Sequence, residues 1–245
     1  MPFFEHDSNT IHYETRGEGF PVLLLAPGGM NSTIDFWERA TINPLVDLRD
    51  DGYRLIAMDQ RNAGDSSGPL DTHDPWRAYA TDQLGLLEHL GIERCLAFGC
   101  CIGGSFILKL CELAPERLVG AVLEQPIGVS PDNAHLFDAM WRTWGAALLE
   151  RQPSLDAATL EEFGAAMWGG AEFVVSVDRD SVRACPTPLL VLPGVDDHHP
   201  GPTAREVAAL APRAEVFEPW KETPEDAALA VRAVRDFLAR HRRDI

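Results

Sequence analysis

Basic residues and long apolar runs are both scarce in this chain of 245 residues. Lys and Arg number 21 against 38 Asp and Glu, which gives a formal net charge of −17. An acidic surface repels phosphate backbones and anionic lipid, so the composition argues against binding to nucleic acids or to membrane surfaces. No uninterrupted apolar stretch is longer than residues 22–26, which are far too few to span a bilayer. We therefore expect a small-molecule substrate.

Cysteines are also few, and their spacing is not that of a zinc site. The five are Cys95, Cys100, Cys101, Cys111 and Cys185. The first six residues have neither a basic region nor a long apolar run, so we expect no targeting segment and reduced thiols in a cytoplasmic protein. No Gly-x-Gly-x-x-Gly follows a predicted strand. The sequence therefore predicts neither a metal nor a nucleotide or flavin cofactor.

Short apolar runs alternate with helical patterns along most of the chain. A hairpin is expected at residues 3–14, around the turn-forming residues Asp7-Ser8-Asn9. Six further runs lie at residues 22–26, 53–58, 95–98, 118–123, 189–192 and 214–217. Runs without polar alternation are typical of strands that are buried on both faces. Strands alternating with helices predict an α/β fold with a parallel sheet between two helical layers.

Residues 128–185 interrupt this alternation with two helical patterns and no convincing strand pair. They contain three of the six tryptophans, Trp141, Trp144 and Trp168. An insertion beside the carboxyl ends of parallel strands overhangs the usual ligand crevice. We therefore expect a core made of residues 1–127 and 186–245, and a helical lid at 128–185 whose tryptophans shape an apolar pocket. Ordinary helix–helix packing in the core is the alternative.

A strand-to-helix junction at residues 96–105 contains Gly-x-Cys-x-Gly. A tight turn between a strand and a helix needs small neighbours two positions on either side, and Gly99 and Gly103 supply them. The Cys101 side chain would then project above the sheet at the N-terminus of a helix, whose positive end favours a thiolate. The alternative is that Cys101 is a buried cysteine that packs as a small apolar residue.

This junction resembles the nucleophile elbow of the α/β-hydrolase superfamily, with cysteine in the serine position. Three more segments are similar to family motifs. Pro27-Gly28-Gly29 resembles the oxyanion loop, and residues 59–66 resemble the Asp-x-Arg-Gly-x-Gly-x-Ser loop, with Asn62 replacing a glycine. Residues 188–197 resemble the strand and turn that carry the acid. The resemblance implies a mostly parallel eight-stranded sheet with a helical lid inserted after the sixth strand. The cysteine elbow of this chain is similar to those of dienelactone hydrolases and of polyhydroxyalkanoate synthases. The synthases are much longer chains.

One family feature is missing, because the loop at 219–224 after the last strand contains no histidine. His198 and His199 instead follow Asp196-Asp197 in the segment that resembles the acid turn. Counting from Gly194 puts the family acid at Asp197. In extended backbone residues i and i+2 share a face, so His199 would stand beside Asp197 and His198 would point away. We expect His199 to replace the missing base; loss of the base is the alternative.

Together these residues predict a thiol-dependent hydrolase of a small ester, lactone or thioester. Cys101 would form an acyl-enzyme, His199 would transfer the proton and Asp197 would orient it, with Glu124 at the end of the sixth strand as a second candidate acid. The resemblance places the oxyanion hole at the N–H groups of Gly29 and Ile102. Acyl transfer or carbon–carbon lyase chemistry on the same scaffold stays open. So does a non-catalytic binding or sensor protein.

Overall fold

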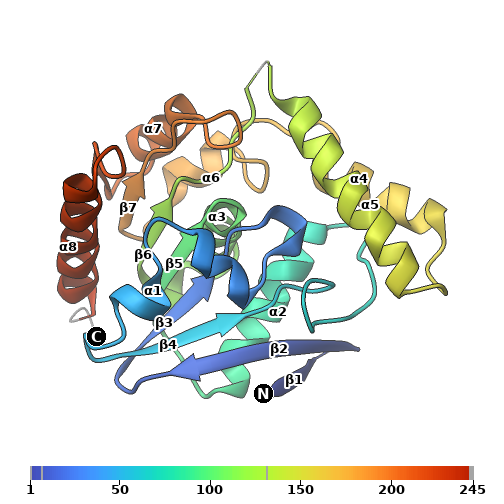
Figure 1. Ribbon diagram of the computed structural model, residues 1–245, viewed down its shortest axis with the longest axis horizontal. Helices are drawn as coiled ribbons and strands as arrows, with labels where there is room; N and C mark the ends of the chain where they lie inside the picture. Colours follow the sequence, from blue (N-terminus) through green and yellow to red (C-terminus); the bar gives the residue numbers. More distant parts are fainter. Residues whose placement is uncertain (1, 7, 131, 243–245) are drawn as a thin grey trace.

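An eight-stranded sheet runs through the centre of the molecule, in the order β1-β2-β4-β3-β5-β6-β7-β8 (Figure 1). The computed structural model describes residues 2–6, 8–130 and 132–242. The strands are β1 (Phe3–His6), β2 (Asn9–Arg16), β3 (Phe20–Leu25), β4 (Tyr53–Met58), β5 (Cys95–Cys100), β6 (Leu118–Glu124), β7 (Leu189–Leu192) and β8 (Ala214–Val216). The β1–β2 and β2–β4 pairs are antiparallel, and every other pair is parallel. The predicted fold class and the N-terminal hairpin are confirmed; Asp7 of its turn lies outside the described residues.

Helices cover both faces of this sheet. The α-helices are α1 (Pro44–Asp47), α2 (Pro75–His89), α3 (Ile102–Leu113), α4 (Ala134–Arg151), α5 (Ala157–Trp168), α6 (Arg179–Ala184), α7 (Gly201–Leu210) and α8 (Pro224–His241). Short 3-10 helices are η1 (Gly29–Asn31), η2 (Ile34–Arg39) and η3 (Pro115–Arg117). None of the helices in the described ranges is long and apolar enough to cross a membrane.

The apolar runs of the central strands are buried on both faces, whereas β8 at the edge of the sheet is largely exposed. In β3, Leu23 and Leu25 pack with residues of α2 and α3, whereas Val22 and Leu24 pack with residues of α8 on the opposite face. All four side chains are fully buried. Successive strand residues point to opposite faces, so a strand inside such a sheet needs apolar residues throughout.

The segment between β6 and β7 forms α4, α5 and α6, and no strand occurs among its described residues. Figure 1 shows α4 and α5 side by side at one end of the molecule, and α4 packs against both α5 and η1. Near the start of α4, Asn133 Nδ2 donates to the carbonyl oxygens of Gly128 (2.8 Å) and Asp197 (2.6 Å). This end of α4 is therefore bonded to the loop that follows β7.

The other end of α4 is bonded to Asn62, the residue that replaces the glycine of the family motif. Asn62 has φ 62°, a left-handed conformation that asparagine adopts more readily than most residues. Its carbonyl accepts from Arg151 Nη2 (2.9 Å), and its Oδ1 accepts from Gln152 Nε2 (3.0 Å). Because a glycine could not make the side-chain bond, the departure from the motif adds a contact to α4.

Candidate active site

Cys101 occupies a strained turn between β5 and α3. Its φ of 58° and ψ of −121° lie outside the regions that L-residues usually adopt. A Cβ on Gly99 would lie 2.4 Å from the carbonyl of Gly103, and a Cβ on Gly103 would lie 2.0 Å from the carbonyl oxygen of Leu25. The sequence analysis therefore predicted the need for glycine at both positions correctly. The turn leaves Cys101 partly exposed, while Cys95, Cys100, Cys111 and Cys185 are buried.

The Cys101 thiol and the His199 ring line the same cavity and interact with each other. Burial raises the pKa of the Cys101 thiol, but the contact with His199 and the N–H groups of Ile102 and Gly28 lower it by more, so the net pKa is below its ordinary value. Burial lowers the pKa of His199, but the Cys101 sulfur and Asp196 raise it by more. These opposite shifts favour a thiolate paired with an imidazolium.

The carboxylate beside His199 belongs to Asp196 and not to Asp197. His199 Nδ1 lies 2.7 Å from Asp196 Oδ1, which also accepts from the backbone N–H groups of His198 and His199, each at 3.1 Å. Asp197 is exposed, and its backbone carbonyl is bonded to Asn133. The expected i, i+2 pairing is wrong because residues 196–199 form a turn, in which the His199 N–H bonds to the Asp196 carbonyl at 3.1 Å. A turn brings residues i and i+3 together.

His198 does not point away from the site as expected. Its ring packs edge-on against Phe137 with centroids 6.1 Å apart, and it lines the same cavity as His199. The two histidines still differ, because Asp196 and Cys101 shift the pKa of His199 upward. Nε2 of His199 is buried and has no hydrogen-bond partner among the described residues, so it is free to exchange a proton within the cavity.

A cavity of about 500 Å³ opens at Cys101. Its apolar wall is formed by Phe36, Ile127, Phe137, Met140 and Trp168. Gly28, Gly29 and Ile102 of the expected oxyanion region line it too. Met140 of α4 lies directly over Gly29, since a Cβ on Gly29 would be 2.1 Å from its sulfur. The helices α4 and α5 therefore contribute to the wall of this cavity.

Of the three tryptophans expected in the pocket, only Trp168 lines this cavity. Trp141 packs over Gly164 of α5, where its ring would be 2.5 Å from an added Cβ, and it lines a separate cavity between α4 and α5. Trp144 is buried beside Phe163, and its Nε1 donates to the Asn62 carbonyl at 3.3 Å. Phe137 and Met140 take the places expected for these two tryptophans, because they lie on the face of α4 that is turned toward Cys101.

Glu124, the second candidate acid, is fully buried at the end of β6. Burial raises its pKa to about 8, although the Ile42 N–H and Lys221 act in the opposite direction. Its Oε1 accepts from Ile42 N at 3.2 Å, and its other carboxyl oxygen has no hydrogen-bond partner among the described residues. The carboxylate that bonds to His199 is that of Asp196. The loop at 219–224 contributes Lys221, whose Nζ donates to Gln125 Oε1.

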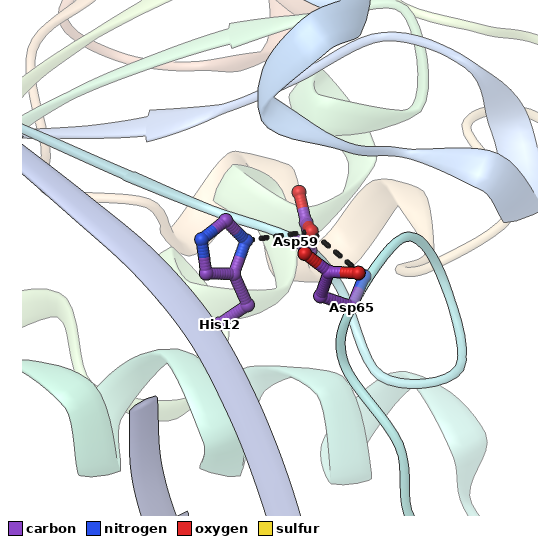
Figure 2. Close-up of side chains that lie close together, drawn as sticks. All are labelled: His12, Asp59 and Asp65. Carbon is purple, nitrogen blue, oxygen red and sulfur yellow. Dashed lines mark hydrogen bonds and ion pairs between the residues drawn. The ribbon is translucent and has the colours of Figure 1, made fainter. Parts of the chain in front are cut away.

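One group of three residues in the described ranges brings possible metal-binding atoms within 4.8 Å of one another: His12, Asp59 and Asp65 (Figure 2). The Asp59 carboxylate already accepts from Ile34 N (2.8 Å), from Asp65 N (3.1 Å) and from His12 Nδ1 (2.8 Å). In Figure 2 the other ring nitrogen of His12 points away from both aspartates. These bonds organise the loop after β4, so the group fits a structural role better than a metal site.

This geometry agrees with what comparison with known proteins shows. The sequence model of a family described as "alpha/beta hydrolase fold" matches residues 21–182. The chain belongs to this family. The crystal structure of the enol-lactonase from Burkholderia xenovorans LB400 is similar, with a TM-score of 0.72 and 20% identity over 97% of this chain and 100% of that one.

Curated relatives include hydrolases of bacterial origin. The 2-hydroxymuconate semialdehyde hydrolase of Pseudomonas putida is 28% identical over 263 residues, which cover 91% of this chain and 89% of that protein. The 2-hydroxy-6-oxo-6-phenylhexa-2,4-dienoate hydrolase of Comamonas testosteroni is 33% identical over 125 residues, 50% of this chain and 42% of that protein. The chain spans about half the length of most curated relatives that it matches.

Several residues of the site were not found from the sequence. Asp196 was dismissed in favour of its neighbour, although an aspartate followed three residues later by its partner is a common turn pattern. Met140, Phe36 and Arg39 carry no motif, and only the folded chain brings them to Cys101. Gly28 was expected as part of the loop, and its N–H also lowers the pKa of the Cys101 thiol.

Proposed function

We propose that this protein is a thiol-dependent hydrolase of small carbonyl compounds, with Cys101 as nucleophile, His199 as acid–base and Asp196 as the residue that orients His199. The observation that carries the proposal is the pairing of an elbow cysteine of lowered pKa with a histidine of raised pKa. A cysteine depends less than a serine on activation by a histidine, because its thiolate is populated near neutral pH. The two curated relatives described above are hydrolases, which supports the same class of reaction.

The proton moves between two named atoms in each half of the reaction. The Cys101 thiolate attacks the carbonyl carbon, and the leaving alkoxide or thiolate takes the proton from Nε2 of His199. Water then attacks the thioester, Nε2 takes its proton, and the carbon–sulfur bond breaks to restore the thiolate. Asp196 is bonded to Nδ1, which leaves Nε2 as the ring nitrogen that can exchange the proton.

Backbone N–H groups would stabilise the oxyanion that forms on the substrate. Ile102 follows the nucleophile at the start of α3, and Gly29 lies in the loop after β3, so both face the cavity that Cys101 opens into. Such a donor is typically worth about 3–4 kcal/mol of barrier. The Gly28 N–H lowers the pKa of the Cys101 thiol and would stabilise the thiolate before attack.

The segment 128–185 is proposed as the lid of this site. Phe137, Met140 and Trp168 come from it and form much of the apolar wall, and Met140 covers Gly29. A wall of this kind suits a compact acyl group and excludes water from the thioester. The proposed division of the chain is the same as in the sequence analysis, with residues 1–127 and 186–245 forming the core.

The test combines turnover with the mass of the intact protein. With 4-nitrophenyl butyrate, we expect release of nitrophenol and, after rapid acid quenching, a population heavier by one butyryl group. Cys101→Ala should abolish both. Cys185→Ala is the matched control, because contact with Cys111 lowers the pKa of Cys185 to about 7 even though the residue is buried.

Three results would contradict the proposal in different ways. Turnover that survives Cys101→Ala would mean that another group is the nucleophile. A butyryl adduct that maps to Cys185 would assign the reactive thiol elsewhere. Saturable binding of the ester by the wild-type protein without adduct or turnover would identify a binding protein on a hydrolase scaffold.

A further inference from the structure

The cavity at Cys101 is lined by basic side chains and by no described carboxylate, although the protein is strongly acidic. Its lining residues include Arg39, His198 and His199, and no Asp or Glu is among those described. The chain as a whole carries a formal charge of −17. A cleft with low-dielectric walls concentrates the field of the charges that line it. The cavity therefore differs in charge from the surface that surrounds it.

Arg39 is unusual among the arginines of this chain because no protein group satisfies it. Its guanidinium lies over the Phe36 ring at 4.5 Å, and it has no hydrogen bond or ion pair to any described residue. Most other arginines pair with carboxylates or backbone carbonyls, as in the bond of Arg61 to Asp82 at 2.8 Å. Arg54 and Arg232 also have no such partner within the described ranges, but neither lines this cavity.

The position of Arg39 is fixed by the element that carries it. It is the last residue of η2, which follows the glycine loop closely, and it is an exposed residue that lines the cavity at its rim. Stacking on Phe36 orients the planar guanidinium and leaves its N–H groups free. A guanidinium held in this way binds a carboxylate with two parallel hydrogen bonds.

We propose that Arg39 is a specificity-determining residue that binds a carboxylate on the substrate. This inference rests on the proposed function and narrows it: the substrate is an ester, lactone or thioester that carries a carboxylate apart from the carbonyl attacked by Cys101. The apolar wall of Phe137, Met140 and Trp168 then contacts the carbon chain between the two groups. A charge-assisted pair of this kind gives about a tenfold to a hundredfold preference over a neutral analogue.

The first experiment measures binding without any turnover. Iodoacetamide labels Cys101, and the protection of Cys101 is measured with butanoate, pentanoate and hexanoate and with the corresponding neutral amides. The carboxylates should protect the wild-type protein at about tenfold lower concentration than the amides. Arg39→Gln should remove this difference, and Arg39→Lys should keep part of it. Arg232→Gln, which removes an unpaired arginine remote from the cavity, should leave the difference unchanged.

The second experiment measures turnover of 4-nitrophenyl hydrogen glutarate against 4-nitrophenyl pentanoate. We expect Arg39→Gln to lower the ratio of kcat/KM for the charged ester to kcat/KM for the neutral ester about tenfold or more, mainly through the KM of the charged ester. Equal protection by acids and amides in the wild-type protein would overturn the assignment of Arg39. If neither ester is hydrolysed but carboxylates still protect Cys101 through Arg39, the proposed reaction fails while the carboxylate site stands.

Discussion

The elbow at Cys101 and the turn at Asp196–His199 lie at the same edge of the sheet, but they are held in place in different ways. At the elbow, Gly99 packs against Gly103 and Gly103 packs against Leu25, so backbone meets backbone between buried elements. In the turn, most of the bonds end on one carboxylate, that of Asp196, which is 50% exposed. The position of the nucleophile is therefore built into the core, whereas the position of the base depends on a surface residue.

The largest effect should come from filling the two glycine positions. Gly103→Ala places a Cβ against the Leu25 carbonyl inside the core, and we expect a loss of about 3 kcal/mol in the free energy of unfolding. Gly194→Ala places a Cβ 2.3 Å from the His199 carbonyl oxygen, but residues 195–198 are exposed and have room to shift. This variant should stay folded and lose activity. Urea unfolding and ester turnover of both variants test the contrast.

Gly85→Ala is the control for these two substitutions. Gly85 lies within α2, and a Cβ there would meet only the His6 ring at 3.2 Å, so stability should change little. Equal losses of unfolding free energy in all three variants would show that close packing at the elbow contributes no more to stability than packing at the other two glycines.

Removal of the base should have the next largest effect. His199→Ala is expected to lower kcat by two to four orders of magnitude, roughly the range for one acid–base group. His198→Ala is the matched neighbour: it removes a cavity wall residue but not the contact with Cys101, so it should act mainly on KM. If the two variants lose kcat equally, the assignment of the base to His199 is wrong.

The smallest of the three effects should follow from Asp196→Asn, with Asp197→Asn as its neighbour control. A half-exposed ion pair contributes about 1 kcal/mol or less, so turnover should fall about fivefold. The pH dependence of Cys101 alkylation tests the role of Asp196 more specifically than turnover does. Asp196 raises the pKa of His199, and the imidazolium lowers the pKa of Cys101. Without Asp196 the alkylation midpoint should therefore move to higher pH, and Asp197→Asn should leave it in place.

The elbow could be predicted from the sequence because its constraints are local. Gly99, Cys101 and Gly103 lie within five residues, and the apolar run before them identifies a buried strand. The mostly parallel eight-stranded sheet followed from the family resemblance together with the alternation of strands and helices. These patterns depend on backbone sterics, which are local and independent of the tertiary structure.

The partner of His199 could not be predicted in the same way. The choice between Asp196 and Asp197 depends on whether residues 196–199 are extended or turned, and composition does not decide this. The pocket wall depends on which face of α4 meets the sheet edge, so Trp141 and Trp144 were placed wrongly and Met140 was missed. Arg39 reaches the site only through tertiary packing.

The attachment of α4 at both of its ends has a consequence for how ligands enter and leave. Asn133 bonds one end to the loop after β7, and Asn62 holds Arg151 and Gln152 at the other. A helix fastened twice cannot swing aside as a unit, so access to the cavity opens when side chains such as Met140 and Phe137 change rotamer. Such changes take place in nanoseconds, whereas domain movements take microseconds to milliseconds. Exchange of small ligands should then be fast. The chemical steps, and not the opening of the lid, should limit kcat.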